Sequence, residues 1–74
     1  MPTTKINFSI PKSANVKLAV YDLLGREIET LVHEFKKPGN YNVDFDGTNL
    51  ASGAYFYRIE AGDFTSVKKM VLLK

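Results

Sequence analysis

The sequence predicts an all-β protein: a small antiparallel β-sandwich of six to seven short strands. Apolar residues recur at every second position in several segments, the spacing that places them on one face of a pleated strand. Residues typical of turns separate these segments at short intervals. One later segment is rich in aromatic residues, which favour strands. Several short strands at this spacing are typical of a sandwich.

The predicted strands follow one another along the whole chain. In the first three alternating segments, the apolar members are Ile6, Phe8 and Ile10; Val16, Leu18 and Val20; and Tyr41, Val43 and Phe45. Residues 54–60 form the aromatic-rich strand, and residues 64–73 form a last apolar run. In each alternating segment the polar members are left for solvent, so one face of each strand is expected in the core.

Turn residues mark the connections between these strands. Residues 22–25 suit a type I turn, with aspartate first and glycine fourth. Residues 37–40 suit a type II turn, because Pro38 presets the first central φ angle and Gly39 tolerates a positive second one. Residues 62–63, Gly-Asp, suit a two-residue hairpin loop.

Residues 26–37 allow two interpretations. The positions with helical spacing are Ile28, Leu31, Val32 and Phe35. Glutamates early in this segment and lysines late in it also suit a helix dipole. However, Ile28, Thr30 and Val32 alternate as in a strand, and both neighbouring segments are strands. We therefore predict a strand over about residues 26–32.

Length and composition restrict what the chain can be. Its 74 residues, without repeats or linkers, suggest one domain over residues 1–74. It has no cysteine and one histidine, which excludes thiolate and histidine-cluster metal sites. A hydrophobic fraction of 45% is too high for a disordered tail, and a net charge of +2 is too weak to indicate nucleic acid. No stretch is long enough to span a membrane, and no signal peptide is expected at the N-terminus.

Catalytic chemistry finds no support in the sequence. His33 is followed by Glu34 but is not accompanied by a nucleophile motif. The motifs Gly-x-Ser-x-Gly and Gly-x-Gly-x-x-Gly and the P-loop are absent. We therefore expect His33 to be a solvated surface group, and we predict neither enzyme activity nor a cofactor.

Residues 42–47 copy the first half of a calcium-binding loop. Asn42, Asp44 and Asp46 supply oxygens at its first, third and fifth positions, and glycine occupies the sixth. Gly53 stands at the twelfth position, where such a loop has a bidentate glutamate. We expect the three polar residues to be the solvated face of a strand, with calcium binding as the open alternative.

The aromatic residues also have two interpretations. Tyr55 and Tyr57 alternate with Phe56, so this strand carries aromatic side chains on both faces. One face must be exposed or covered, and we favour core packing over a platform for stacking ligands. Residues 50–55 resemble the corner before a sandwich strand, where the Tyr55 hydroxyl would bond to upstream backbone.

Charge is unevenly distributed. Residues 1–63 contain seven basic and eight acidic residues, whereas residues 64–74 contain three lysines and no acid. Lysines on a terminal strand can protect a sheet edge from pairing with other chains. Alternatively, residues 68–74 form a basic, apolar tag that is offered to a receptor. Deleting Met70 to Lys74 is then expected to leave the rest of the chain mostly folded. Composition alone favours edge protection.

Motifs in a fixed order give a more specific indication. They are residues 2–11 (PTTKINFSIP), 16–27 (VKLAVYDLLGRE), 37–41 (KPGNY), 50–58 (LASGAYFYR) and 68–72 (KKMVL). This set resembles the type A C-terminal sorting domain of the type IX secretion system over essentially the whole chain. That family is related to the immunoglobulin-like domain of flagellar hook-capping proteins.

The resemblance implies an immunoglobulin-like sandwich at the C-terminus of exported proteins of the Bacteroidetes type. Such a domain directs a cargo fused on its N-terminal side through the outer-membrane translocon. Its implied partners are the secretion shuttle protein and the sortase-like peptidase, which commonly cleaves it off. The parent would carry the signal peptide, pass through the periplasm and become secreted or attached to the cell surface. The domain would act through protein–protein recognition, without nucleic acid or a membrane-spanning segment.

The resemblance also suggests recognition residues. The Gly-x-Tyr motif of the family falls on Gly53 and Tyr55, and its lysine-rich C-terminal motif falls on Lys68, Lys69, Val71 and Lys74. The full predicted set is Gly53, Tyr55, Lys68, Lys69, Met70, Val71, Leu72, Leu73 and Lys74. Family members usually carry a Pro-Asn-Pro-Phe-Asn stretch where Met1 stands here, so the linker and cleavage region are expected to be missing.

Two other functions remain open on the sequence. An immunoglobulin-like structural or adhesive module, or a hook-cap-like assembly module, would have the same strands. A small carbohydrate-binding module could use exposed tyrosines. A terminal strand with one unpaired edge could also exchange between chains, so either a monomer or a strand-swapped dimer is expected.

Overall fold

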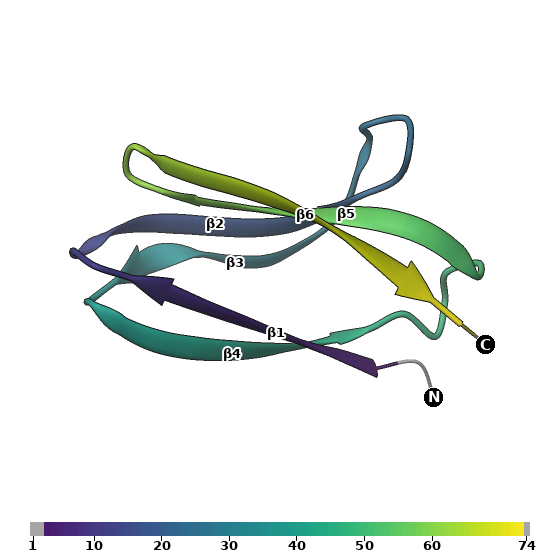
Figure 1. Ribbon diagram of the computed structural model, residues 1–74, viewed down its shortest axis with the longest axis horizontal. Helices are drawn as coiled ribbons and strands as arrows, with labels where there is room; N and C mark the ends of the chain where they lie inside the picture. The colour runs from purple at the N-terminus through teal and green to yellow at the C-terminus, as the bar shows by residue number, and fades with distance from the viewer. Residues whose placement is uncertain (1–2, 74) are drawn as a thin grey trace.

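Six strands and no helix make up the part of the chain that the computed structural model describes, residues 3–73 (Figure 1). The strands are β1 (Thr3–Ile10), β2 (Ala14–Tyr21), β3 (Glu27–Lys36), β4 (Gly39–Asp46), β5 (Gly53–Ala61) and β6 (Phe64–Leu72). The all-β prediction is thereby confirmed, with the number of strands within the expected range.

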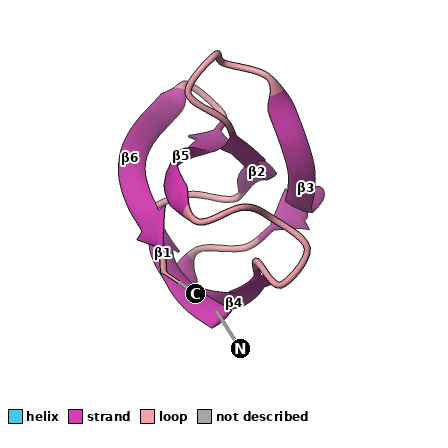
Figure 2. Ribbon diagram, turned by 90° about the vertical axis from the view of Figure 1, so that its right-hand side faces the viewer, coloured by secondary structure: helices cyan, strands magenta, loops and turns pink. Residues whose placement is uncertain are grey.

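The strands form two antiparallel sheets. The small sheet pairs β1 with β4, and the large sheet has the order β3-β2-β5-β6. Figure 2 shows the two sheets facing one another, with β3 and β6 at opposite sides of the large one. This arrangement agrees with the small immunoglobulin-like sandwich that the sequence predicts.

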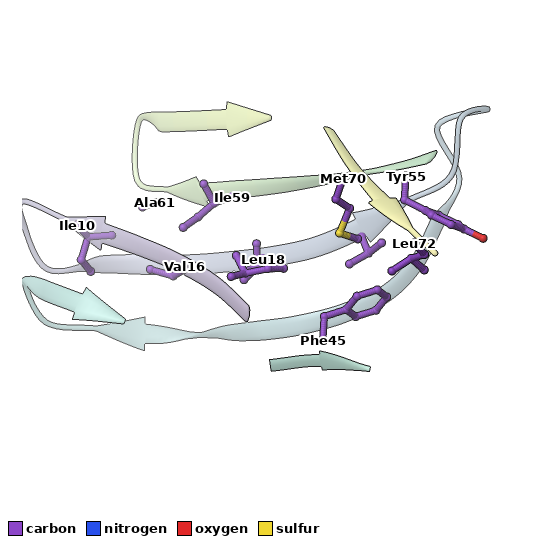
Figure 3. Close-up of a cluster of buried hydrophobic side chains, with 11 residues drawn as sticks. Ile10, Val16, Leu18, Phe45, Tyr55, Ile59, Ala61, Met70 and Leu72 are labelled. Carbon is purple, nitrogen blue, oxygen red and sulfur yellow. The ribbon is translucent and has the colours of Figure 1, made fainter. Parts of the chain in front are cut away.

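The core lies between the sheets and is built from the alternating apolar residues. Its buried side chains are Ile6, Ile10, Val16, Leu18, Val20, Phe45, Tyr55, Ile59, Ala61, Met70 and Leu72 (Figure 3). Phe8, Tyr41 and Val43 pack against this cluster and are partly buried. Alternation therefore identified the inward face correctly, because successive side chains of a strand point to opposite faces.

Two of the three predicted turns are confirmed. The amide of Gly25 donates to the carbonyl oxygen of Asp22 at 3.0 Å, which closes the turn between β2 and β3. Residues 62–63 form the two-residue turn between β5 and β6, and Gly62 has a φ of 62°. A positive φ at this position is readily adopted by glycine.

The expected type II turn at residues 37–40 is wrong. Gly39 has a φ of 152°, whereas a type II turn needs about +80° there. The reason is topological: β3 belongs to the large sheet and β4 to the small one. This connection therefore carries the chain from one sheet to the other and does not close a hairpin.

The ambiguous segment is a strand, as predicted, but it continues to Lys36 instead of ending near residue 32. Its register with β2 shifts twice. Leu18 and Ala19 pair with Val32 and Thr30, so Leu31 is an extra residue, and Ile28 is a second one. Such bulges break strict alternation, and they account for the helix-like spacing of the apolar residues in this segment.

Candidate functional site

Strand β6 forms one side of the large sheet and has one paired edge. It pairs with β5 in continuous register, from Ala61 opposite Phe64 to Gly53 opposite Leu72. No strand within residues 3–73 pairs with its other edge. Alternate backbone amides and carbonyls of β6 therefore face outward, which is the arrangement that accepts an additional strand.

The two faces of β6 differ sharply. Met70 and Leu72 point into the core, and their exposed fractions are 8% and 1%. Between them Val71 is 56% exposed on the outer face of the sheet. The segment from Met70 onward therefore contributes to the core. From this burial we expect that removing the segment would destabilise the core, whereas the sequence alone suggested that the rest would stay mostly folded.

The structure brings together the two predicted recognition motifs. Gly53 lies opposite Leu72 and Tyr55 opposite Met70, so the Gly-x-Tyr motif and the C-terminal motif are paired across two strands. Leu73 follows β6 and is 80% exposed. Lys74 lies outside the described residues. The predicted residues that are described thus lie together at the end of the β5–β6 hairpin, but Tyr55, Met70 and Leu72 belong to the core, and only the others are exposed.

Tyr55 fixes the loop that leads into this hairpin. Its hydroxyl donates to the carbonyl oxygen of Ala51 at 2.7 Å, as the sequence predicts for this corner. Its ring is buried beside the end of β6 (Figure 3). Because the bond joins the strand to a residue four positions upstream, it holds residues 51–55 as one unit.

Gly53 and Gly47 support the same region for different reasons. Gly53 has a φ of 144°, yet a Cβ atom placed on it would meet nothing within 4 Å. Its backbone conformation, and not crowding, favours glycine. At Gly47 a Cβ atom would lie 2.7 Å from Cδ1 of Leu72. Gly47 therefore allows the end of β6 to pack closely, a role that sequence patterns do not reveal.

Charge distinguishes β6 from the opposite side of the large sheet. On that side Glu27 binds Lys17 at 2.9 Å, and Glu34 binds Lys36 at 2.7 Å. Hydrogen bonds from Lys17 and then Thr30 lower the pKa of the Glu27 carboxyl. None of the four ion pairs formed by the described residues involves Lys68 or Lys69. Both lysines are exposed, so the β6 edge is cationic.

A hollow of about 520 Å³ runs beside β6. Phe64, Ser66 and Lys68 line it from β6, and Phe8 lines it from β1. Tyr41, whose ring stacks on Phe8 with centroids 5.4 Å apart, is also part of its wall. Side chains of a strand added to β6 would find partly apolar space here.

The other candidate residues are placed apart from this edge. His33 is exposed on β3, opposite Lys17. Asn42, Asp44 and Asp46 lie on the solvated face of β4, as expected. Within residues 3–73 no group of three or more possible metal ligands is found. No helix of the described part is long and apolar enough to cross a membrane.

Comparison with known proteins gives one finding. A family model described as secretion system C-terminal sorting domain matches residues 2–73. No curated protein and no solved structure matches the chain.

Proposed function

The chain belongs to the family of secretion system C-terminal sorting domains, and we propose that it sorts its cargo by offering the unpaired edge of β6 to a strand of a receptor protein. Domains of this family are sorting tags for type IX secretion, by which proteins reach the cell surface or the exterior. The family is one of sorting signals and not of catalysts. The proposal concerns how this chain is recognised.

A difference between the two outer strands of the large sheet carries this proposal. Strand β3 contains two bulges, and bulges twist an edge away from further pairing. Strand β6 keeps continuous register over its whole length. Of the two outer strands, β6 therefore offers the more regular template for an added strand.

Charge defines the complementary receptor. Lys68 and Lys69 are exposed without an ion pair among those found in residues 3–73. A receptor strand with carboxylates near its paired edge would bind these lysines while its backbone pairs with β6. Main-chain hydrogen bonds would supply much of the affinity, and the lysine contacts would supply selectivity.

We further propose that residues 1–74 act as a single sorting domain within this pathway. A parent protein would carry the cargo on the N-terminal side, together with a signal peptide for entry into the periplasm. The receptor would be the secretion shuttle protein, and the sortase-like peptidase would then remove the domain. The domain itself would supply no catalytic group in this scheme.

Charge reversal tests the proposal. The chain is fused behind a periplasmic reporter in a host with a type IX system, and export to the cell surface or medium is measured. The wild-type fusion should be exported, and Lys68→Glu/Lys69→Glu should reduce export about tenfold or more, because like charges would face the receptor. The control Lys12→Glu/Lys37→Glu makes the same charge change at exposed residues outside β6.

The control variant should be exported like the wild type. Retention of the wild-type fusion in the periplasm would contradict a sorting function. Equal export of both charge variants would contradict recognition through β6. All four lysines are exposed, so the two variants should have free energies of unfolding within about 0.5 kcal/mol of each other, as measured by urea unfolding.

A further inference from the structure

One end of the outer face of the large sheet carries a shallow, partly apolar depression next to β6, and Asp22, Arg26 and Ser52 contribute the polar part of its lining. We call it the valley and define it by Leu23, Leu24, Gly53, Ala54 and Val71. Ala54 and Val71 are paired across β5 and β6, and Leu23 and Leu24 line a hollow of about 290 Å³ together with Gly53 and Ala54. Figure 1 shows the β2–β3 turn, the start of β5 and the end of β6 at the same end of the molecule.

The outward direction of the valley follows from strand alternation. Tyr55 is buried, so its neighbour Ala54 faces away from the core. Likewise Val71 lies between two buried residues of β6 and faces outward. Leu23 also lines an adjoining hollow of about 260 Å³ with Tyr21 and Phe56. The small side chains at residues 53–54 thus form a floor between taller aliphatic side chains.

The wall formed by Leu23 and Leu24 is held in place by hydrogen bonds. The Asp22 carboxylate accepts the amides of Leu24 and Arg26, each at 2.9 Å, and binds the Arg26 side chain at 2.7 Å. The amide of Asp22 donates to the carbonyl of Arg26 at 3.0 Å. Binding to an ordered turn loses less conformational entropy than binding to a flexible one.

The exposure of these side chains is the reason to assign the valley a partner. Leu23 is 63% exposed, Leu24 78% and Val71 56%. Single exposed apolar residues are ordinary on protein surfaces. Here, however, Leu23 and Leu24 line one depression on a turn that polar bonds hold in place. Val71 is paired with Ala54 of its floor, on the strand whose other edge is open.

We propose that the valley accepts a large apolar side chain of the same receptor protein whose strand pairs with β6, a second contact that rests on the proposed function. The neighbouring charge indicates the chemistry of that receptor segment. Lys69 faces outward opposite Phe56 and is exposed. The receptor segment would therefore combine a leucine-, methionine- or phenylalanine-like side chain with a nearby carboxylate. A second copy of this chain fits less well, because its own outer face here would present Lys69 again.

Filling the floor of the valley tests the inference. Ala54→Arg places a long, charged side chain between the walls without touching the core. The matched control is Thr65→Arg, which puts the same side chain on the same outer face at the other end of β6, opposite Glu60. In the reporter fusion, Ala54→Arg should lower export about tenfold, as loss of a binding hot spot does. Thr65→Arg should stay within about twofold of the wild type.

The outcomes separate this inference from the sorting function. Export of the wild type together with normal export of Ala54→Arg would overturn the valley and leave recognition through β6 intact. Equal loss in Ala54→Arg and Thr65→Arg would also overturn it, since the effect would not be local. Retention of the wild-type fusion would overturn both proposals.

A second variant guards against misfolding. Leu23→Ser/Leu24→Ser removes the wall, and Phe35→Ser removes an apolar side chain that is 61% exposed on β3. Purified domains should show urea midpoints close to the wild type for both. The leucine variant alone should lose export, and unchanged export of a folded leucine variant would contradict the valley as a receptor contact.

Discussion

The two outer strands of the large sheet, β3 and β6, each have one edge that is unpaired within residues 3–73, and these edges differ in regularity and in charge. Strand β3 carries two bulges and is tied by ion pairs to β2 and within itself. Strand β6 is regular, and its two central lysines make no ion pair among the four that the described residues form. Edge strands that must not pair are usually irregular or charged. Here β3 is irregular, whereas β6 is regular and carries two exposed lysines.

The difference extends to the core. On β3 the apolar residues Ile28, Leu31 and Val32 are partly buried, whereas on β6 Met70 and Leu72 belong to the buried cluster. The deep packing of Leu72 holds the end of β6 from its core side. We therefore expect truncation on β6 to destabilise the domain more than the same truncation on β3.

The largest effect is expected from the same truncation on each strand. Leu72→Ala removes a side chain that is 1% exposed and should lower the free energy of unfolding by about 2–5 kcal/mol. Leu31→Ala, on the partly buried bulge of β3, should cost about 1 kcal/mol. Urea unfolding of both variants measures this difference. Equal losses would mean that β3 and β6 are anchored alike.

A smaller effect is expected at Gly47, where the β4–β5 loop touches the end of β6. Gly47→Ala places a methyl group 2.7 Å from Cδ1 of Leu72, and the resulting overpacking should cost about 1–3 kcal/mol. Asn49→Ala, at an exposed position of the same loop, should stay within about 0.5 kcal/mol of the wild type. Thermal unfolding of the two variants is the measurement. A Gly47→Ala variant as stable as the wild type would show that Leu72 can move aside.

Two tyrosines allow a comparison of the loops beside each strand. Tyr55 donates to Ala51 next to the end of β6, and Tyr41 donates to Lys37, which directly follows β3. Tyr55→Phe should cost about 1 kcal/mol, because its hydrogen bond is partly buried. Tyr41→Phe should cost less, since its bond is exposed to water. A larger loss for Tyr41→Phe in urea unfolding would reverse this order.

The smallest effect concerns pH and is confined to the β3 side. Hydrogen bonds from Lys17 and Thr30 lower the pKa of the Glu27 carboxyl from its ordinary 4.5. Because the pKa is lower in the folded state than in the unfolded state, the ionised carboxylate stabilises the fold at pH values above the unfolded pKa. This contribution is lost as the pH falls through the pKa of the folded state. Glu27→Gln should therefore be slightly less stable than the wild type at about pH 7, and the difference should shrink as the pH is lowered from the ordinary value of 4.5 toward about pH 3.

For a substitution on β6, the change in stability should not depend on pH. Lys69 takes part in none of the four ion pairs formed by the described residues, so Lys69→Met should differ from the wild type by about the same small amount at both pH values. Urea midpoints of both variants at the two pH values check this. A pH-dependent difference for Lys69→Met would reveal an ion pair on β6.

The sequence was sufficient for the features that depend on near neighbours. Alternation placed Ile6, Val16 and Phe45 in the core because side-chain direction in a strand depends only on position. The corner bond of Tyr55 followed from a local pattern, and the order of the motifs was sufficient to indicate the family. The first two of these features depend on residues that are close along the chain, and the third can be recognised from the linear order of short motifs.

Only the tertiary structure decided how the strands are partitioned between the sheets. The separation of β3 and β4 into different sheets explains why the type II turn predicted around Gly39 does not form. The bulges at Ile28 and Leu31 explain why residues 26–37 show both helical and strand spacing. The valley and the contact of Gly47 with Leu72 join residues distant in the sequence. Local pattern determines which way a side chain points. It does not determine which strand lies beside it, because that choice depends on how all the apolar faces are buried together.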